Sequence, residues 1–274
     1  QTLDAQFFIT CGGMLSAPME KLFKGQETFK GRIFHTSRWP KEKVDLEGKR
    51  VGVVGIGATG IQVIQTIADQ VGELKIFVRT PQYVLPMKNP KYGKDEVAAY
   101  HGRFDELQKV LPTTFTGFEH DFVHVWADLT PAQRLEVLEE IYADGSLKLW
   151  LASFAEMFFD EAVSEEISEF VRQKMRARLK DPALCDLLIP GKGDYGFGTH
   201  RVPLETNYLE VYLRPNVTAV SVKDNAITEI VPYGIKLADG SVHELDVIIL
   251  ATGFDAGTGA LTRIDIRGRD NRSL

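Results

Sequence analysis

The segment Lys49–Thr80, KRVGVVGIGATGIQVIQTIADQVGELKIFVRT, decides the fold of this chain. Its apolar run Val51–Val54 is typical of a strand buried in a parallel sheet. This run leads directly into a complete G-x-G-x-x-G at Gly55–Gly60, and apolar side chains then recur at helical spacing as far as Val71. A second strand is expected at Leu74–Val78. The sequence therefore predicts an α/β fold built around a parallel sheet.

Each glycine of this motif has a separate expected role. Gly55 allows a tight turn, Gly57 lets the backbone approach a pyrophosphate, and Gly60 lets helix and strand pack closely. The N-terminus of the helix then offers free N–H groups and a partial positive charge to the same pyrophosphate. A merely structural glycine turn is the alternative, but the position between a strand and a helix favours a Rossmann-like dinucleotide site. The predicted cofactor-binding residues of the turn are Gly55, Gly57, Ala58, Thr59, Gly60 and Gln62.

The end of the second strand indicates which dinucleotide binds. NAD sites usually carry an Asp or Glu about 20 residues after the glycines, where it holds the ribose 2′-hydroxyl. This chain has Arg79 followed by Thr80 at that position, and no carboxylate. A guanidinium can bind a 2′-phosphate in a fork, whereas a carboxylate would repel it. Arg79 and Thr80 are therefore predicted to contact NADP; a solvated surface arginine is the alternative.

Composition and length limit the classes of function. At 274 residues with 44% hydrophobic content, the chain can bury a sizeable core. A net charge of −6 argues against a general role on nucleic acid or a membrane surface, and no apolar run approaches a membrane span. Cys11 and Cys185 form no C-x-x-C, which excludes a thioredoxin-reductase-type dithiol and fits a reducing, cytoplasmic compartment. Because the first residue is Gln1 rather than Met, we expect a longer protein.

A second motif lies upstream of the glycine turn. Phe29–Pro40 reads FKGRIFHTSRWP and contains F-x-G-x-x-x-H-x-x-x-W-P. Together with the glycine turn and Arg79, this pattern resembles the fingerprint of Baeyer–Villiger monooxygenases, and the resemblance runs through essentially the whole chain. It implies an enzyme that depends on FAD and NADPH and has two dinucleotide-binding domains. On spacing alone, His35 would be a loop histidine and Trp39 a core anchor.

The resemblance also implies roles for individual residues. The segment Gly191–Gly198 is rich in glycine and expected to be flexible, and the basic residues after it suit a loop that closes over an anionic ligand. Arg201 matches the active-site arginine of the family, a catalytic residue expected to stabilise developing negative charge. His200 stands where the family usually has a lysine that contacts the NADP 2′-phosphate, so the preference for NADP is expected to rest mostly on Arg79. His35, the second catalytic candidate, is expected to couple cofactor binding to domain movement rather than to transfer a proton.

Two further strands are predicted at Ala5–Gly13 and Leu245–Gly253, each ending in small residues and a glycine turn. Strands of this kind close nucleotide-binding sheets in flavoproteins with two dinucleotide sites. The first is expected to close a FAD-binding sheet whose earlier strands, with the FAD pyrophosphate loop, lie outside this chain. The second is expected to close the sheet that starts at Val51. Two ordinary buried strands with terminal glycines are the alternative.

Over residues 81–190 the alternation of strands and helices stops. Thr130–Pro131 predicts the start of a helix and Gly145 its end, while a second helix is expected to begin at Ser164 and to terminate at Asp181–Pro182. This region is interpreted as a helical insertion within the NADP-binding domain, as the resemblance implies. No metal site is predicted, because the region's histidines share no ligand spacing with one another or with cysteines: His101, His120 and His124.

The predicted architecture is thus a Rossmann-like NADP-binding domain with a helical insertion, plus edge segments of a second, FAD-binding Rossmann-like domain. The expected segments are 1–40 (end of the FAD-domain sheet and fingerprint linker), 41–84 (first part of the NADP-binding domain), 85–192 (helical insertion), 193–253 (second part of the NADP-binding domain) and 254–274 (return to the FAD domain). A hairpin that turns at Asp239–Gly240 is expected near the end of the sheet.

The function implied by the resemblance is NADPH- and FAD-dependent insertion of one oxygen atom next to a ketone carbonyl, which gives an ester or lactone. The expected partners are a small-molecule ketone, molecular oxygen and the missing portions of the same chain, with no nucleic acid and no membrane. One alternative is an N- or S-oxygenating flavin-containing monooxygenase, a group that usually lacks the equivalent of Trp39–Pro40. Another is a non-catalytic NADP-binding module. For Arg201, the alternative is an ion pair with a carboxylate such as Glu205 that only pins the loop.

Overall fold

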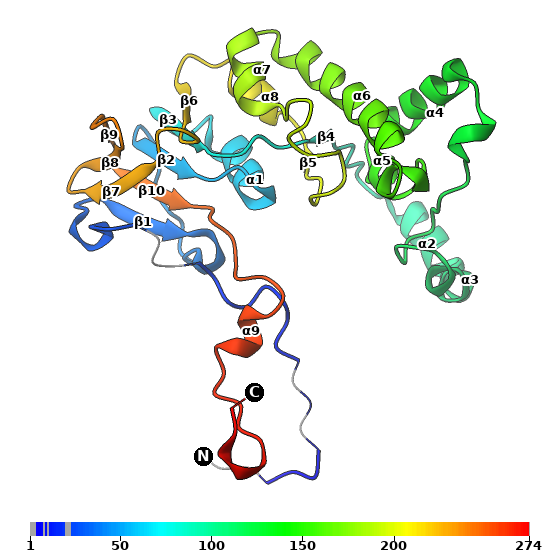
Figure 1. Cartoon of the computed structure of the whole chain (residues 1–274), viewed down its shortest axis with the longest axis horizontal. Helices are drawn as coiled ribbons and strands as arrows, with labels where there is room; N and C mark the ends of the chain where they lie inside the picture. The colour runs from blue at the N-terminus through cyan, green and yellow to red at the C-terminus, as the bar shows by residue number, and fades with distance from the viewer. Residues whose placement is uncertain (1–3, 8, 10, 20–22, 274) are drawn as a thin grey trace.

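The computed structural model describes residues 4–7, 9, 11–19 and 23–273 (Figure 1). Its strands are β1 (Arg32–His35), β2 (Arg50–Val54), β3 (Glu73–Val78), β4 (Leu85–Pro86), β5 (Leu204–Glu205), β6 (Val217–Ser221), β7 (Ile227–Val231), β8 (Gly234–Leu237), β9 (Val242–Glu244) and β10 (Val247–Leu250). Its helices are α1 (Ala58–Ile67), α2 (Lys94–Gly102), α3 (Phe104–Val110), α4 (Pro131–Asp144), α5 (Lys148–Leu151), α6 (Glu161–Leu179), α7 (Pro182–Leu188), α8 (Tyr208–Val211) and α9 (Gly259–Thr262). In the part of the chain that the structure describes, no helix is both long and apolar enough to cross a bilayer.

A parallel sheet of five strands, in the order β1-β10-β2-β3-β6, forms the centre of the molecule. The two expected strands around the glycine turn are confirmed as β2 and β3, with Val53 opposite Ile76. All four residues of β10 are buried, because this strand lies between two others and its faces are covered. The Rossmann-like α/β fold predicted from the sequence is confirmed.

The edge of this sheet comes from the fingerprint motif, which the sequence analysis treated as a linker. Residues Arg32–His35 form β1 and pair with β10, so that His35 lies opposite Leu250. Leu250 in turn lies opposite Val54 of β2. His35 of the fingerprint is therefore in register with Val54, the last residue of β2 before the glycine turn.

Helix α1 is shorter than its apolar pattern predicts. It ends at Ile67, although Ala68 and Val71 are also buried. The side-chain amide of Asn216 donates hydrogen bonds of 3.2 Å to the carbonyls of both residues. Carbonyls at the end of a helix lack an internal partner, and this amide supplies one, so the chain can turn towards β3 one turn early.

The helical insertion between β3 and β6 is confirmed and contains α2 to α7. Helix α4 starts as expected, because the hydroxyl of Thr130 and the side chain of Gln133 cap each other's backbone N–H groups. Gly145, with a φ of 73°, ends the helix in the left-handed conformation that glycine adopts at little cost. The predicted bounds of this helix are therefore confirmed.

The start of the next long helix was predicted too late. Helix α6 begins at Glu161, since the carboxylate of Asp160 accepts hydrogen bonds from the N–H groups of Ala162 and Val163. Asp181 was expected to terminate this helix, but it caps the N-terminus of α7 instead. The interruption between α6 and α7 falls at Lys180, which has a φ of 59°.

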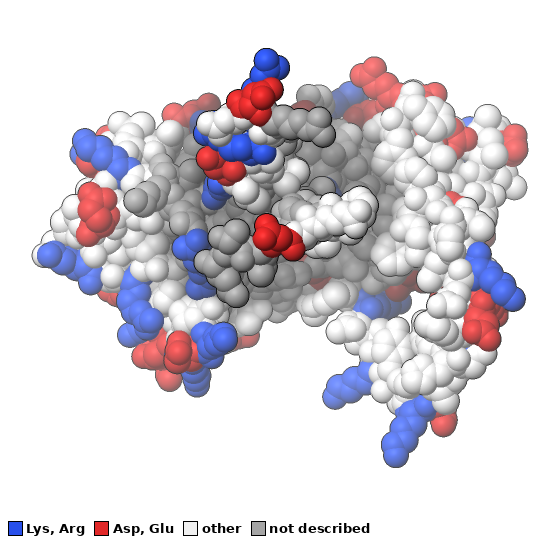
Figure 2. Space-filling view, turned by 90° about the horizontal axis from the view of Figure 1, so that it is seen from below, with Lys and Arg blue, Asp and Glu red and all other residues white. Residues whose placement is uncertain are grey.

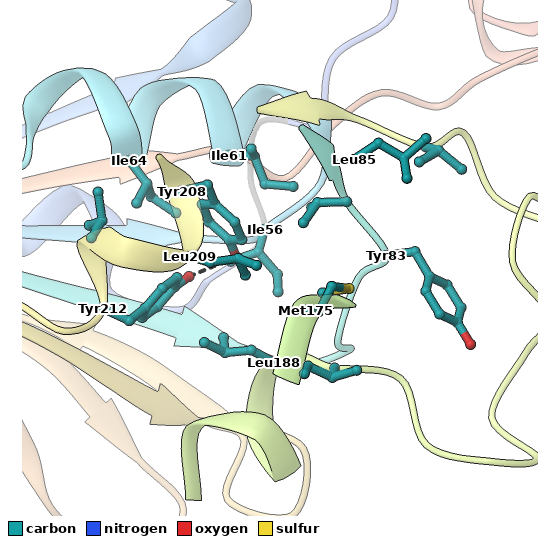
Figure 3. Close-up of a cluster of buried hydrophobic side chains, with 14 of the residues drawn as sticks. Ile56, Ile61, Ile64, Tyr83, Leu85, Met175, Leu188, Tyr208, Leu209 and Tyr212 are labelled. Atoms are coloured by element: carbon teal, nitrogen blue, oxygen red, sulfur yellow. Dashed lines mark hydrogen bonds between the residues drawn. The ribbon is translucent and has the colours of Figure 1, made fainter. Parts of the chain in front are cut away.

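The Rossmann-like sheet and the insertion share one hydrophobic core (Figure 3). Ile61 and Ile64 of α1 point towards Leu209 of α8, and Met175 of α6 lies in the same cluster (Figure 3). The hydroxyl of Tyr212 donates a buried hydrogen bond of 2.7 Å to that of Tyr208. Because side chains from both parts fill one core, the insertion is held firmly relative to the sheet.

The predicted strand at Ala5–Gly13 is wrong for the residues that the structure describes; Phe8 and Thr10 lie outside them. None of the described residues in this range is in a strand, and Phe7 and Ile9 are about four-fifths exposed, at 79% and 82%. A strand needs a neighbour for its backbone hydrogen bonds, and this segment has none among the described residues. The stretch after it runs beside the segment that follows β10, where Met19 N–H donates to the carbonyl of Gly253 (Figure 1).

The hairpin at Asp239–Gly240 is confirmed, but it does not extend the main sheet. Strands β7, β8 and β9 form a separate antiparallel sheet, and β6 is the last strand of the parallel one. Asn225 stabilises the turn, because its amide donates to the Asp239 carboxylate and its oxygen accepts from the Asp239 N–H.

Candidate dinucleotide site and the loop that faces it

The glycine turn has the backbone geometry expected of a pyrophosphate cradle. Gly55 has a φ of 100°, and a Cβ there would lie 2.7 Å from the carbonyl oxygen of Ala251. A Cβ on Gly60 would collide with the carbonyl of Gly55, so this glycine allows α1 to pack against β2. At Gly57 no atom lies within 4 Å of the position of a Cβ. The space left open at Gly57 is where a ligand backbone could approach.

The start of α1 is available to an anion. Gly57 is the N-cap and supplies no side-chain cap, and the first backbone bond runs from Ile61 N–H to the Gly57 carbonyl at 3.0 Å. Ala58 is half-buried, whereas Thr59 and Gln62 are exposed. An uncapped N-terminus at the carboxyl edge of a parallel sheet favours a phosphate group by both hydrogen bonding and the helix dipole.

Arg79 and Thr80 leave the carboxyl end of β3, directly beside this turn. Strands β2 and β3 are neighbours, and Gly55 N–H donates to the carbonyl of Phe77 at 3.2 Å. Both Arg79 and Thr80 are exposed, and the Arg79 guanidinium makes no ion pair with any residue that the structure describes. The predicted cation for a 2′-phosphate therefore lies at the correct edge of the sheet and is not neutralised by a carboxylate there.

The glycine-rich segment before Arg201 is anchored, whereas the sequence predicted that it would be flexible. The hydroxyl oxygen of Tyr195 lies 2.8 Å from the carbonyl oxygen of Pro81 and 2.7 Å from the side-chain oxygen of Gln82, so its single proton is shared between these two acceptors. The amide nitrogen of Gln82 donates to the carbonyl of Arg201 at 3.3 Å. Two further hydrogen bonds join this segment to the helical insertion. The indole of Trp150 donates to the Gly198 carbonyl, and the N–H of Phe197 donates to the Ser168 hydroxyl.

His200 and Arg201 are exposed at the end of this anchored segment. The ring of His200 stacks on that of Tyr195, with centroids 4.3 Å apart and planes at 28°. Immediately after Arg201 the chain pairs with the segment that follows Arg79, through the short parallel pair β4 and β5. The segment that carries His200 and Arg201 is thus held beside the segment that follows Arg79, on the other side of the insertion in the sequence.

The alternative role for Arg201, an ion pair with Glu205, is wrong. Glu205 is fully buried, and both of its carboxylate oxygens accept hydrogen bonds from Arg178, at 2.5 and 3.2 Å. The same carboxylate also accepts from the N–H of Tyr208. Arg201 makes no ion pair with any residue in the described part of the chain.

His35 connects the fingerprint strand to the end of β10. Ser37 N–H donates to His35 Nδ1 at 3.2 Å, so Nδ1 is the acceptor and the ring proton of the neutral tautomer is assigned to Nε2. Nε2 then donates to the hydroxyl of Thr252 at 3.2 Å, and this hydroxyl donates to the carbonyl of Met19. The half-buried imidazole therefore joins three segments of the chain.

Three anchoring residues were missed by the sequence analysis: Gln82, Trp150 and Tyr195. A usable signal existed for Tyr195, because a large aromatic residue inside a run of glycines is more often an anchor than part of a mobile loop. Burial raises the pKa of the Tyr195 phenol, so it stays protonated and able to donate. No group of three or more residues suited to holding a metal occurs among the residues that the structure describes.

A second G-x-G-x-x-G, at Gly191–Gly196, is part of the same anchored segment. It follows helix α7 rather than a strand, and the chain after it enters β5 rather than a helix. It therefore lacks both the sheet edge and the helix N-terminus that hold a pyrophosphate.

Comparisons with known proteins agree with this geometry. Residues 2–144 match the family model described as flavin-binding monooxygenase-like. Over 273 residues the chain is 73% identical to an acetone monooxygenase (methyl acetate-forming) from Gordonia sp. (strain TY-5), covering 100% of this chain and 51% of that protein. It is 36% identical to a Baeyer-Villiger monooxygenase from Pseudooceanicola batsensis, covering 98% of this chain and 49% of the relative.

A similar fold is found in the crystal structure of OTEMO in complex with FAD and NADP, with a TM-score of 0.91 and 40% identity over 96% of this chain and 50% of that one. The chain spans about half the length of the curated relatives it matches. The predicted resemblance to Baeyer–Villiger monooxygenases is confirmed. The chain belongs to the flavin-binding monooxygenase-like family.

Proposed function

We propose that the protein containing this chain is an NADPH- and FAD-dependent Baeyer–Villiger monooxygenase, which inserts one oxygen atom next to a ketone carbonyl and forms an ester or lactone. One observation carries this proposal. Arg79 leaves β3 beside the open glycine turn, the Arg201 carbonyl is hydrogen-bonded to Gln82 three residues after Arg79, and neither arginine has a carboxylate partner among the described residues. Such an arrangement offers one cation for the dinucleotide and another for the reacting groups.

The residues of this chain fit NADP. The open space at Gly57 would admit the pyrophosphate, the N–H groups at Ala58 and Thr59 would donate to it, and Arg79 would hold the 2′-phosphate. We assign Thr80, Gln62 and His200 to the rim of the same site, since all three are exposed, Thr80 follows Arg79, Gln62 lies in the first turns of α1, and His200 stacks on Tyr195. The proposed contact of His200 with the 2′-phosphate is the weaker one, because an imidazole carries less charge than the lysine it replaces.

FAD is proposed as the second cofactor on the strength of the family and of the relatives' complexes. Among the described residues, Gly55–Gly60 is the glycine turn with a strand before it and a helix after it, and we assign this turn to NADP. We therefore propose that the FAD pyrophosphate is held by sequence outside this chain. The division into 1–40, 41–84, 85–192, 193–253 and 254–274 stays a proposal of the same kind.

When bound, the two cofactors supply the hydride and the oxygen chemistry, and the protein positions them. Arg201 is proposed to stabilise the negative charge that develops on the substrate oxygen, because a fixed guanidinium in a preorganised site lowers the barrier to forming an oxyanion. Its carbonyl is fixed by Gln82, which limits how far the guanidinium can move. His35 is proposed to link cofactor binding to domain movement through Thr252.

The proposal is tested by NADPH oxidation in the complete natural protein, with and without a ketone. Since one relative is named for acetone, acetone and cyclic ketones are the first substrates to compare. We expect ketone-dependent oxidation with formation of an ester, measured by gas chromatography. Oxygenation of amines or sulfides without any ester would favour the N- or S-oxygenating alternative. Tight NADPH binding without any turnover would favour a non-catalytic module.

A cytoplasmic location is proposed as well. Cys11 and Cys185 are both free in the structure, in agreement with a reducing compartment.

A further inference from the structure

We propose that Tyr195 is a positioning residue that sets the place of His200 relative to Arg79, and thereby strengthens the preference for NADPH over NADH. This inference rests on the proposed NADP site. It assigns a role to a side chain that lies behind the nucleotide site rather than in contact with the ligand.

The hydroxyl of Tyr195 attaches the loop to the end of β3. Its two acceptors, the Pro81 carbonyl and the Gln82 side-chain oxygen, belong to the residues directly after Arg79–Thr80. The orientation of the Gln82 amide is fixed by its other end, because a flipped amide would place its oxygen against the carbonyl of Arg201. A short series of hydrogen bonds therefore connects the segment that carries Arg79 with the main chain of Arg201.

The ring of Tyr195 packs against other aromatic side chains. Tyr83 meets it edge-on, with centroids 5.4 Å apart and planes at 86°, and Tyr83 meets Phe197 in the same way. The hydroxyl of Tyr83 accepts a hydrogen bond of 2.9 Å from Arg172, whose side chain is only 1% exposed. A phenol supported in this way cannot turn without breaking packed contacts, so it presents a fixed face to His200.

The imidazole of His200 lies flat on that fixed face. His200 is exposed, and so is Arg79, which lies at the end of β3 two residues before the Pro81 carbonyl that the Tyr195 hydroxyl contacts. Stacking removes much of the rotational freedom of the imidazole before any ligand arrives, and a preorganised donor binds with a smaller loss of entropy. The 2′-phosphate is the group that distinguishes NADPH from NADH, so the benefit of this placement falls on NADPH alone.

The test measures the dissociation constants of NADPH and NADH for the complete natural protein and for five variants, one of them a control. We expect Tyr195→Leu, which removes both hydroxyl and ring, to lower the preference for NADPH about 5- to 10-fold. Tyr195→Phe keeps the stacked ring and is expected to lower it about 2- to 3-fold. His200→Ala should lower the preference for NADPH as much as Tyr195→Leu does. The double variant Tyr195→Leu/His200→Ala should lower it no further, because both changes remove the same contact.

Tyr212→Phe is the matched control. It too removes a tyrosine hydroxyl, here the buried one that bonds to Tyr208, and is expected to lower stability without changing the ratio of the two dissociation constants. Equal weakening of NADPH and NADH by Tyr195→Leu, or additive losses in the double variant, would overturn the positioning role. An unchanged ratio in Tyr195→Phe and Tyr195→Leu would do the same while leaving the NADP site intact. Failure of the unmodified protein to bind NADPH would instead overturn the proposed function on which this role depends.

Discussion

Two pairs of arginines differ in what surrounds them. Arg172 and Arg178 project from α6 and are largely buried, with side-chain exposures of 1% and 23%. Each is bonded to two carboxylates, Arg172 to Glu165 and Glu169 and Arg178 to Glu205 and Glu210. Arg79, just after β3, and Arg201, just before β5, are exposed and have no ion-pair partner in the part of the chain that the structure describes.

The difference separates cations that hold the fold from cations that are available to a ligand. A buried guanidinium keeps its charge only if carboxylates and hydroxyls replace the lost water. Its charge is therefore already paired within the fold and is not available to a ligand. An exposed guanidinium without a carboxylate keeps its full attraction for an incoming anion. On the face shown in Figure 2, acidic and basic side chains are intermixed around the periphery.

The largest effect is expected from breaking a buried pair. Glu205→Ala removes the carboxylate from Arg178 and the acceptor from Tyr208 N–H, and we expect it to lower the free energy of unfolding by about 3–5 kcal/mol. Urea denaturation measures the loss. Glu210→Ala is the matched control, because it removes the other carboxylate of Arg178 at a side chain that is 46% exposed, and should cost about 1 kcal/mol or less. Equal losses would show that burial does not decide the strength of these pairs.

The next effect concerns the reaction. Arg201→Ala is expected to lower the rate of ester formation about 100- to 1000-fold, which is the usual loss when a preorganised charge beside an oxyanion is removed. Stability and NADPH binding should change little, because the Arg201 side chain makes no ion pair within the described chain. Arg201→Lys should rescue poorly, since an ammonium lacks the planar fork. Turnover that persists in proportion to folded protein would remove Arg201 from the mechanism.

A smaller effect is expected at the nucleotide. Arg79→Ala should raise the dissociation constant of NADPH about 10- to 100-fold, the range for one charge-assisted pair, and leave that of NADH nearly unchanged. Isothermal titration of both nucleotides measures this. Arg176→Ala removes an exposed arginine that is paired with Glu169 and should alter neither constant. If Arg79→Ala weakened both nucleotides equally, Arg79 would be a structural residue.

The smallest effect belongs to an intermediate case, Arg50, which is half-exposed and paired with Asp246. Hydrogen bonds from the Arg50 side chain and N–H lower the pKa of Asp246. A carboxyl whose pKa is lower in the folded state stabilises the protein above its unfolded pKa of about 3.9, and this contribution is lost as the pH falls towards the folded pKa. At 42% exposure the pair is screened, so Asp246→Asn should cost at most about 1 kcal/mol at neutral pH. Thermal unfolding should show this difference shrinking on acidification; a difference that grows would contradict the assignment.

The parts of the fold that were predicted correctly depend on local sequence. The strand, glycine turn and helix at Val51–Ile67 were readable because a continuous apolar run, glycine spacing and helical periodicity all lie within one short window. The same spacing at Gly191–Gly196 has no strand before it and no helix after it, and it forms a different structure. Pattern and context together, rather than the pattern alone, predicted the site.

The parts that were missed depend on partners far away in the sequence. β1 is a strand because Arg32–His35 meets β10, and the loop before Arg201 is rigid because Trp150 and Ser168 hold it from the insertion. Conversely, the apolar run at Ala5–Gly13 forms no strand in the described residues. An apolar composition alone does not make a strand, because a strand also needs a second strand to pair with. The positions of Arg79 and Arg201 agree with their predicted roles, but the roles themselves stay predictions.

The arrangement of the insertion also has a consequence for how the chain folds. β3 and β6 are hydrogen-bonded neighbours, with Leu74 opposite Val217, although the entire insertion separates them in sequence. Contacts of such long range form slowly, because the entropy of closing the loop is lost before the contacts are gained. We therefore expect the β2–α1–β3 unit to form early, and the sheet to acquire β6 only after α6, α7 and α8 have packed on α1. The nucleotide edge, which needs both sides of the insertion, would then be among the last features of the molecule to mature.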